Sequence, residues 1–173
     1  MNEILDAIKK RRSIRKYDPK YVVPDSDIEL LLEAGMLAPS AVNMRPWEFI
    51  VVKNREKLDE ITKIHRYAQM MKTADHAIVV CALAELHKGK FIDGMWAHDC
   101  GASVQNILLQ AAHLNLGTCW CGIHPQEKLM DEFRALFNIP KTVVPFAVIA
   151  VGKPDEPFGS RGFYEDEKVT FVL

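Results

Sequence analysis

The sequence predicts one domain, residues 1–173, in which α-helices are combined with β-strands. The 173 residues are enough to bury a full core, and no linker-like, repetitive or low-complexity stretch divides them. The hydrophobic fraction of 49% and the charged fraction of 26% are typical of soluble globular proteins. Segments with helical spacing of apolar residues are interspersed with short runs rich in β-branched residues, which predicts helices and strands in one fold.

The first predicted helix, Asn2 to Lys10, leads into a cluster of positive charge. Six of the eight residues from Lys9 to Lys16 are cationic, although the whole chain has a net charge of -1. Guanidinium groups can hold phosphate oxygens in pairs, so this segment is a candidate site for a cofactor phosphate. Alternatively, the cations only complement the C-terminus of the helix, which stabilises it by roughly 0.3–1 kcal/mol. Local charge by itself favours this second interpretation.

The next predicted helix follows Pro24 and ends at Pro39. Ser26 and Glu29 have the spacing of a capping box at its start. A polar loop with two prolines then leads into a predicted strand, Trp47 to Lys53. A rigid polar loop between a helix and a strand can bind a planar ligand, but a turn beside a core tryptophan explains the same residues.

The middle of the chain contains the longest predicted helix. Asn54 is expected to cap a shorter helix, and His76 to Leu83 reads as a buried strand. The long helix runs from about Asp93 to Asn115, with Gly117 expected as its C-terminal cap.

The last third of the chain contains a stretch of small and aromatic residues, Thr118 to Ile123. This stretch is interpreted either as backbone lying close to a ligand or as a short buried strand. Pro125 is expected as the first residue of another helix, and Val143 to Val151 as a strand. The tail ends in an apolar segment, Val169 to Leu173, for which a sheet edge of an adjacent subunit is one candidate partner.

Composition excludes several classes of function. The near-neutral charge argues against a nucleic-acid surface, and no apolar run has the length of a membrane span. The four cysteines lack zinc-ligand spacing, so no metal is expected. Without a secretory signal, we expect a cytoplasmic protein with reduced thiols.

Three landmarks follow one another in a fixed order: Arg11 to Arg15, Pro39 to Trp47, and Gly117 to Ile123. Together with Gly152 to Pro154 and the later Arg161, they resemble the nitroreductase family of FMN-dependent oxidoreductases, in particular its shorter members. The resemblance covers nearly the whole chain. Each motif is moderately specific, and their order and spacing make the combination strong.

The resemblance implies an α+β sandwich in which helices flank a mixed, largely antiparallel central sheet. It also implies an intertwined homodimer that holds two FMN molecules in its interface, with a C-terminal tail that reaches the partner subunit. Such a dimer would account for the long apolar helix and for the apolar end of the tail.

The resemblance also assigns the cofactor site by position. The FMN phosphate, ribityl chain and pyrimidine edge would contact Arg11, Arg12, Ser13 and Arg15. The other subunit would line the ring and ribityl chain with Pro39, Ser40, Ala41 and Asn43. The backbone near flavin N5 would belong to Cys121 and Gly122, and Arg161 is favoured over Lys153 to complete the phosphate site. Ala41 and Arg45 depart from the family's usual serine and glutamine, and the roles of Arg45, Cys119 and Trp120 in the substrate pocket stay open.

The implied activity is the transfer of reducing equivalents from NAD(P)H through flavin N5 to a small electron acceptor, such as a nitroaromatic or a quinone, by a ping-pong mechanism. Because the flavin supplies the redox chemistry, no side chain is assigned as a catalytic acid or base. Arg15 would stabilise negative charge at the N1/O2 edge of the reduced ring. The alternatives are a flavin-fold enzyme for dehalogenation or flavin cleavage, and a non-enzymatic flavin-binding dimer. The choice between NADH and NADPH is left open.

Overall fold

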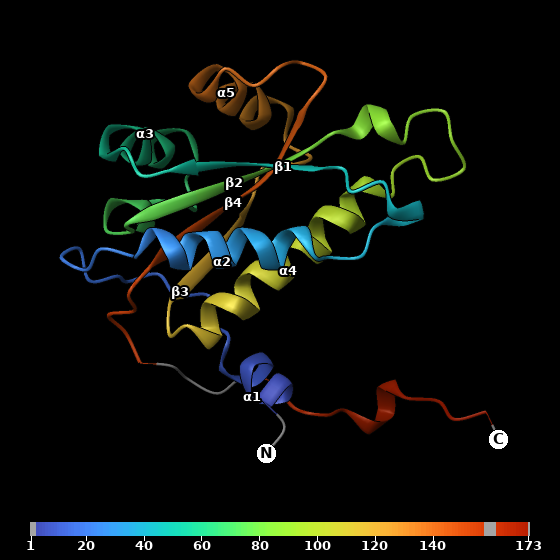
Figure 1. Ribbon diagram of the computed structural model, residues 1–173, viewed down its shortest axis with the longest axis horizontal. Coiled ribbons are helices and arrows are strands. Elements are labelled where there is room, and N and C mark those ends of the chain that lie inside the picture. Colours follow the sequence, from blue (N-terminus) through green and yellow to red (C-terminus); the bar gives the residue numbers. More distant parts are fainter. Residues whose placement is uncertain (1–2, 158–161, 173) are drawn as a thin grey trace.

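The computed structural model describes residues 3–157 and 162–172 (Figure 1). The helices in these ranges are α1 (Glu3–Lys10), α2 (Asp25–Met36), α3 (Arg55–Ile64), α4 (Trp96–His113) and α5 (Glu127–Phe137). The strands are β1 (Trp47–Val52), β2 (His76–Ala82), β3 (Gly117–Gly122) and β4 (Val144–Gly152). Short 3-10 helices are η1 (Ala41–Asn43), η2 (Gln69–Lys72), η3 (Ala84–Leu86) and η4 (Asp166–Lys168).

The four strands form one sheet in the order β1-β2-β4-β3, and neighbouring strands are antiparallel in each of the three pairs. All seven residues of β2 are buried, which agrees with the nearly continuous apolar run in the sequence. One parallel bridge, between Ser13 and Thr118, extends the sheet at the outer edge of β3. The predicted α+β sandwich with a largely antiparallel sheet is therefore confirmed.

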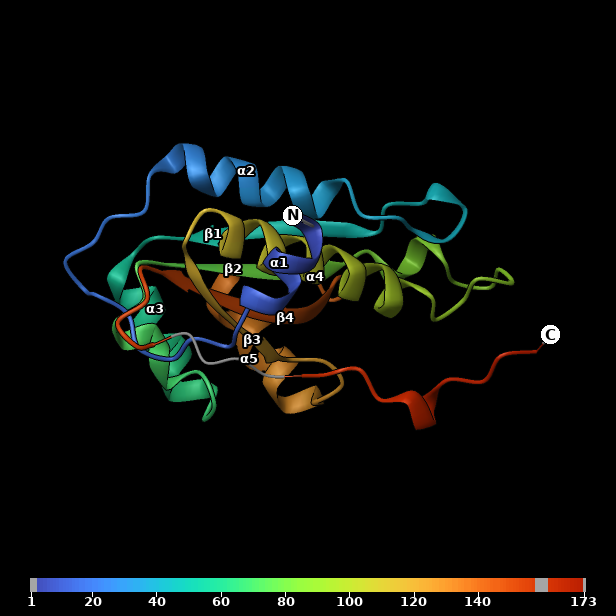
Figure 2. The ribbon, with the colours of Figure 1, turned by 90° about the horizontal axis from the view of Figure 1, so that it is seen from below.

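Helices cover both faces of the sheet (Figures 1 and 2). On one face, α2 and α4 pack against the sheet through a core that includes Leu31 and Ile107. On the other face, α3 and α5 form a second core that includes Ile61 and Phe133. The segment after α1 belongs to this second core, because Ile14 and Tyr17 are buried there.

The segment after α1 lies across the ends of β3 and β4. The N–H of Ile14 donates to the carbonyl of Thr118 at 2.8 Å, and the Tyr17 hydroxyl donates to the carbonyl of Ile14 at 2.7 Å. Two glycines leave room for these side chains. A Cβ at Gly117 would lie 2.9 Å from Ile14 Cβ, and one at Gly152 would lie 2.9 Å from a ring carbon of Tyr17. The cationic segment is therefore held against the sheet by a buried tyrosine and isoleucine.

Two predicted caps are wrong. The second helix already begins at Asp25, so Ser26 lies inside its first turn, and no side chain caps it. The C-cap residue of α4 is Leu114, and the next residue, Asn115, has a φ of 59°, which allows Leu116 N–H to donate to the Ala111 carbonyl at 2.8 Å. Gly117 instead begins β3, where the constraint is the close approach of Ile14.

The other boundaries differ from the sequence predictions by a few residues. The long helix begins at Trp96 rather than near Asp93, and the last helix begins at Glu127 rather than at Pro125, which follows a cis peptide bond. The predicted cap at Asn54 is confirmed, because its side chain accepts from Lys57 N–H at 2.9 Å. Residues Thr118 to Gly122 belong to strand β3, in which Trp120 and Gly122 are exposed, and Cys119 to Gly122 also line a cavity.

Candidate functional site

Two polar cavities meet at Arg15. The first has a volume of about 580 Å³, and its described lining residues are Arg11, Arg12, Ser13, Ile14, Arg15, Glu156, Pro157 and Gly162. The second has a volume of about 420 Å³, and its described lining residues are Arg15, His65, Tyr67, Cys119, Trp120, Cys121, Gly122, His124 and Gln126. The sequence motifs Arg11 to Arg15 and Cys121-Gly122, about 105 residues apart, therefore belong to one continuous region.

The first cavity, here called the cationic cavity, is rich in hydrogen-bond donors. Arg11 and Arg12 are half-buried, and the Arg12 guanidinium donates to the Arg11 carbonyl at 2.6 Å. The Arg15 guanidinium donates to the Ser13 carbonyl at 3.2 Å. One acid is also present, since the Glu156 carboxylate accepts from the backbone N–H groups of Arg15 and Lys16. Three guanidinium groups and one hydroxyl around one carboxylate give a cavity suited to a phosphate dianion.

In the second cavity, here called the ring cavity, a histidine holds the backbone of the lining strand in place. His65 Nδ1 accepts from Tyr67 N–H at 3.2 Å, so the proton on this ring is placed at Nε2, which lies 3.0 Å from the Gly122 carbonyl. This bond holds the end of β3 against the loop after α3. The indole of Trp120 is partly exposed and packs against Phe146 with a ring-centroid distance of 6.0 Å.

Two thiols lie beside Arg15 in the ring cavity. Cys119 and Cys121 point to the same face of β3, and both are buried. The neighbouring Cys121 thiol, with a smaller contribution from the Arg15 charge, lowers the pKa of the Cys119 thiol to about 7. The neighbouring Cys119 and burial raise the pKa of the Cys121 thiol, whose sulfur lies 3.6 Å from the Tyr67 carbonyl.

The second predicted set of site residues, Pro39, Ser40, Ala41 and Asn43, lies far from both cavities. Figures 1 and 2 show the loop with η1 at the opposite end of the sheet from the cationic segment. The Ala41 N–H donates to the buried Asp99 carboxylate at 3.0 Å, and Ser40 Oγ accepts from Arg45 N–H at 2.9 Å. One copy of the chain therefore does not bring the two predicted sets together.

This loop has an unusual backbone. Val42, Asn43 and Arg45 have φ values of 53°, 55° and 49°. The left-handed region is costly for a β-branched residue, so the loop has to be held by its surroundings. The Asp99 carboxylate and the Arg45 guanidinium, which donates to the Met36 carbonyl at 3.3 Å, supply such contacts.

Lys153 and Arg161 are the two residues considered for completing the phosphate site, and only Lys153 lies among the described residues. Lys153 is not among the residues that line the cationic cavity, and its ammonium lies 5.6 Å from the centroid of the Tyr21 ring. Arg161 lies outside the described residues, so its assignment stays a prediction.

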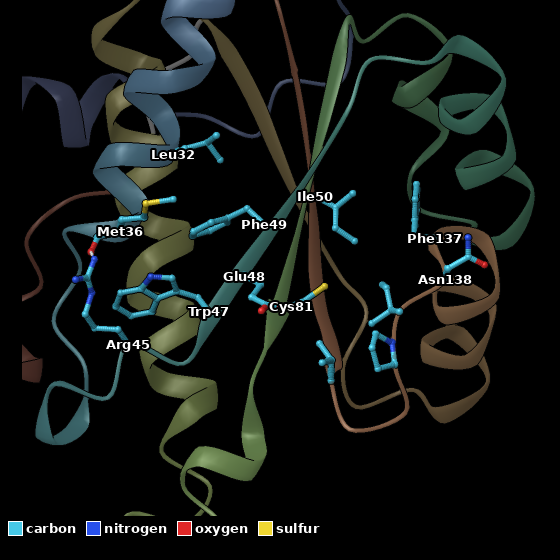
Figure 3. Close-up of a pocket in the computed structure, with 13 residues that line it drawn as sticks. Leu32, Met36, Arg45, Trp47, Glu48, Phe49, Ile50, Cys81, Phe137 and Asn138 are labelled. Carbon is cyan, nitrogen blue, oxygen red and sulfur yellow. Dashed lines mark hydrogen bonds between the residues drawn. The ribbon is translucent and has the colours of Figure 1, made fainter.

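A larger cavity of about 710 Å³ lies elsewhere, along β1 (Figure 3). Figure 3 shows Leu32 and Met36 of α2 on one side of it, Phe137 and Asn138 at the end of α5 on the other, and β1 between them. The outer edge of β1 pairs with no strand among the described residues. This β1 groove combines apolar side chains with open backbone groups, which suits an extended chain segment better than a phosphate.

Apolar side chains are also exposed on α1 and in the tail. No residue of α1 is buried, and Ile4 and the nearby Leu37 are 75% and 73% exposed. Phe171 and Val172 in the tail are 76% and 95% exposed. Exposed apolar residues in such number are typical of a surface that another chain covers.

Metal ligands and membrane spans were also sought in the described ranges. These ranges hold no group of three or more His, Cys, Asp and Glu side chains placed to bind a metal ion. None of the helices in the same ranges has the length and hydropathy that crossing a membrane requires.

Comparison with known proteins decides the family. The sequence profile described as "Nitroreductase family" matches residues 8–68 and 63–153. The chain belongs to the nitroreductase family. It is 46% identical over 167 residues to a protein of Methanothermobacter thermautotrophicus that is named as a candidate NADH dehydrogenase/NAD(P)H nitroreductase, and the match covers 96% of this chain and 85% of the relative.

Solved structures of other nitroreductases have the same fold. An FMN-dependent nitroreductase from Clostridium difficile has a TM-score of 0.87 and 30% identity, with 98% of this chain and 99% of the other covered. A candidate nitroreductase from Desulfovibrio desulfuricans, solved in complex with FMN, has a TM-score of 0.83 and 30% identity, with 100% and 98% covered.

Some residues of this nitroreductase site could not be found from local patterns. His65, Tyr67 and Glu156 line the two cavities, but nothing near them in the sequence marks them as site residues. His65 contacts Gly122 across 57 residues, and Glu156 contacts Arg15 across 141. Arg11, Arg12, Ser13 and Arg15 were predicted as site residues because their charge and donors are concentrated in one short stretch, and all four line the cationic cavity.

Proposed function

We propose that this protein is an FMN-dependent oxidoreductase that takes reducing equivalents from NAD(P)H and passes them to a small acceptor, such as a nitroaromatic or a quinone, by a ping-pong mechanism. The observation that supports this most directly is the junction of the cationic cavity and the ring cavity at Arg15. A flavin mononucleotide has the same two parts, a phosphate and a planar ring. Nitroreductases that use or contain FMN share the fold.

The cationic cavity would hold the phosphate through Arg11, Arg12 and Ser13. These residues follow the C-terminus of α1, whose dipole disfavours an anion, so the guanidinium charges have to supply the attraction. Each charge-assisted hydrogen bond is expected to contribute about 1.5–3 kcal/mol. Arg161 is proposed as a further phosphate contact.

The ring cavity would orient the isoalloxazine ring. When bound, FMN supplies the two-electron chemistry, accepting hydride at N5 and returning electrons to the second substrate. Arg15 would stabilise negative charge at the pyrimidine edge, and the backbone of Cys121 and Gly122 would face N5. His65 fixes this backbone through the Gly122 carbonyl. No side chain of the cavity is required as an acid or base.

We further propose that a second copy of the chain completes the site. The loop with Pro39, Ser40, Ala41 and Asn43 is too far from the cavities of its own chain to line them, so it would line those of the partner. The exposed apolar residues of α1 and Leu37 would be buried between the copies. The β1 groove would accept the tail of the partner, including Phe171, as an added strand.

The test is a flavin spectrum followed by anaerobic turnover. We expect the purified protein to be yellow, to lose its flavin absorbance on addition of NADH or NADPH, and to recover it with a nitroaromatic or a quinone. A preparation that stays colourless after incubation with FMN would refute flavin binding.

A second candidate is a non-enzymatic flavin-binding dimer, which the same cavities would equally allow. The two proposals differ in turnover. Bound FMN that neither NADH nor NADPH bleaches would favour the binding dimer and exclude the reductase.

A further inference from the structure

Asp99 is a buried acidic residue that the proposed function does not use. It lies in the first turn of α4, near the loop with η1 (Figure 1), is 5% exposed, and lines neither the cationic cavity nor the ring cavity. Burying a carboxyl group is costly unless its oxygens are hydrogen-bonded. Oδ1 accepts from the Ala41 N–H at 3.0 Å, and Oδ2 lies 3.7 Å from Nε2 of the fully buried His87. In the described part of the chain, the one hydrogen bond recorded for this carboxyl group therefore goes to the loop around Ala41.

That loop, residues 39–46 and here called the site loop, has few contacts of its own with the rest of the fold. The Ser40 carbonyl, for example, accepts from the Asn43 N–H at 3.0 Å, which is a bond within the loop. Among the hydrogen bonds recorded between described residues, the bond to Asp99 is the one that joins residues 40–44 to another element. The middle of the site loop is therefore tied to α4 at a single backbone donor.

The backbone of the site loop depends on such support. Val42, Asn43 and Arg45 are in the left-handed region, with φ values of 53°, 55° and 49°. Residues other than glycine keep this conformation where their surroundings hold them in it. Without the bond to Asp99, the loop should relax, and the conformation seen here should be populated less.

A second contact from α4 fixes the end of the site loop. Cys100 Sγ donates to the Pro46 carbonyl at 3.8 Å, and the Leu83 N–H donates to the same carbonyl at 2.9 Å. Pro46 directly precedes β1, so this end stays attached to the sheet when the middle of the loop moves. Loss of the bond to Asp99 should therefore change the shape of the loop without detaching it.

We propose that Asp99 is a positioning residue for the flavin site of the partner subunit. It holds the Ala41 N–H, and through it the conformation in which the site loop offers Ser40 and Asn43 to the flavin bound by the other copy. Asp99 itself would touch neither the ring nor the phosphate. This inference rests on the proposed function, from which it takes both the flavin and the second copy of the chain.

The first experiment measures FMN affinity by fluorescence titration of the apoprotein. Asp99→Ala removes the acceptor, so fewer loops have the binding conformation and the Kd for FMN should rise by about 10- to 100-fold. Asp99→Asn keeps an acceptor oxygen and should stay within about threefold of the wild type. Ser103→Ala is the matched control, because Ser103 is a fully buried polar residue one turn further along α4 whose Oγ has no hydrogen-bond partner among the described residues.

A variant on the loop side removes the same bond without changing α4. Ala41→Pro deletes the N–H that donates to Asp99. The position accepts proline, because the preceding Ser40 is extended, with a φ of −143° and a ψ of 153°. Ala41→Gly is its control, since it also loses the methyl group but keeps the N–H. If melting temperatures show that Asp99→Ala does not fold, the pair of variants at Ala41 replaces it, and Ala41→Pro should have the higher Kd.

The second experiment asks which subunit's site Asp99 serves. Co-expression with two affinity tags gives mixed dimers of an Asp99→Ala chain and an Arg11→Ala/Arg12→Ala chain. In such a dimer, the intact cationic cavity of the first chain meets the intact site loop of the second. One FMN per mixed dimer should therefore bind as in the wild type, whereas each variant by itself should bind FMN weakly at both sites. A merely structural role of Asp99 in its own chain would give no such recovery.

The outcomes separate this inference from the proposed function. Wild-type affinity in Asp99→Ala or Ala41→Pro, or equal losses in Asp99→Ala and Ser103→Ala, would overturn the inference and leave the proposed function standing. A loss in Asp99→Asn as large as that in Asp99→Ala would also overturn it, and so would mixed dimers without a tight site. A monomeric wild type that binds FMN would overturn the shared site and this inference, but not flavin binding. A wild type that binds no FMN would overturn the proposed function itself.

Discussion

The cationic cavity and the β1 groove differ in the chemistry that they offer, and the smaller of the two has the donors that a phosphate requires. The groove is larger, about 710 Å³ against 580 Å³, but most of its lining side chains are apolar and it follows an unpaired strand edge. The cationic cavity gathers three guanidinium groups and a hydroxyl. The kind and convergence of hydrogen-bond donors, rather than cavity volume, therefore distinguish a phosphate site from a surface suited to another chain.

The largest expected effect comes from emptying the cationic cavity of charge. Arg11→Ala/Arg12→Ala removes two charge-assisted contacts, which together are worth about 3–6 kcal/mol, so the Kd for FMN should rise by about 10²- to 10⁴-fold. Fluorescence titration of the apoprotein with FMN measures this. Lys9→Ala/Lys16→Ala is the matched control, because it removes the same charge from the same segment without touching the cavity lining. Equal losses in both variants would show that net charge, not the cavity, binds the phosphate.

The next largest effect is expected on dimerisation, from a change in the tail residue that we place in the β1 groove. Phe171→Ala shortens a side chain that is 76% exposed in one copy and that we expect to be buried in the β1 groove of the partner. Losing this burial should cost about 1.5–3 kcal/mol, which weakens dimerisation by about 10- to 150-fold. Sedimentation velocity over a range of concentrations measures the change. Glu167→Ala in η4 is the control. A dimer that survives Phe171→Ala unchanged would argue that the groove has another occupant.

A third prediction tests how the cationic segment is seated. Gly117→Ala places a Cβ 2.9 Å from Ile14 Cβ, so the cationic segment has to move. The free energy of unfolding should therefore fall by about 1–3 kcal/mol. Gly101→Ala in α4 is the matched control, since its Cβ would meet nothing closer than 3.8 Å and should be neutral or slightly stabilising. Urea denaturation compares the two variants. Similar urea midpoints for the two variants would mean that the close approach of Ile14 to Gly117 does not hold the cationic segment.

The smallest effect is a shift in reactivity at the ring cavity. Because the thiolate is the reactive form and the pKa of Cys119 is lowered to about 7, alkylation of Cys119 in the apoprotein should rise with pH and level off above about pH 8. In Cys121→Ala the main cause of the shift is lost, so the midpoint should move upward toward the ordinary thiol value of about 8.5. Mass spectrometry of the alkylated peptide gives both curves. A wild-type midpoint already near 8.5 would contradict the lowered pKa of Cys119.

Local patterns were sufficient for part of this molecule. The continuous apolar run of β2 predicts a strand buried on both faces, and Asn54 predicts the start of α3, because each depends on neighbouring residues. The cationic segment is visible for the same reason. The family resemblance supplied the pairing of this segment with Cys121 and Gly122, and the shared position of Arg15 in both cavities supports it.

Other features depend on distant contacts and were missed. Gly117 looks like a helix cap in the sequence, yet its role is set by Ile14, which is about a hundred residues earlier. His65 gains its role from the Gly122 carbonyl, and Glu156 from the backbone of Arg15. Such contacts are determined by the topology of the sheet and leave no periodic trace in the sequence.

The contact between the cationic segment and Glu156 has a consequence for biosynthesis. The N–H groups of Arg15 and Lys16 bind a carboxylate 141 and 140 positions later, and the Lys16 carbonyl accepts from Asp155 N–H at 2.9 Å. A nascent chain cannot form these bonds while Asp155 and Glu156 are still inside the ribosomal exit tunnel. The cationic segment is therefore held in place only after Glu156 has left the tunnel, and the phosphate binding that we propose for it would follow that step.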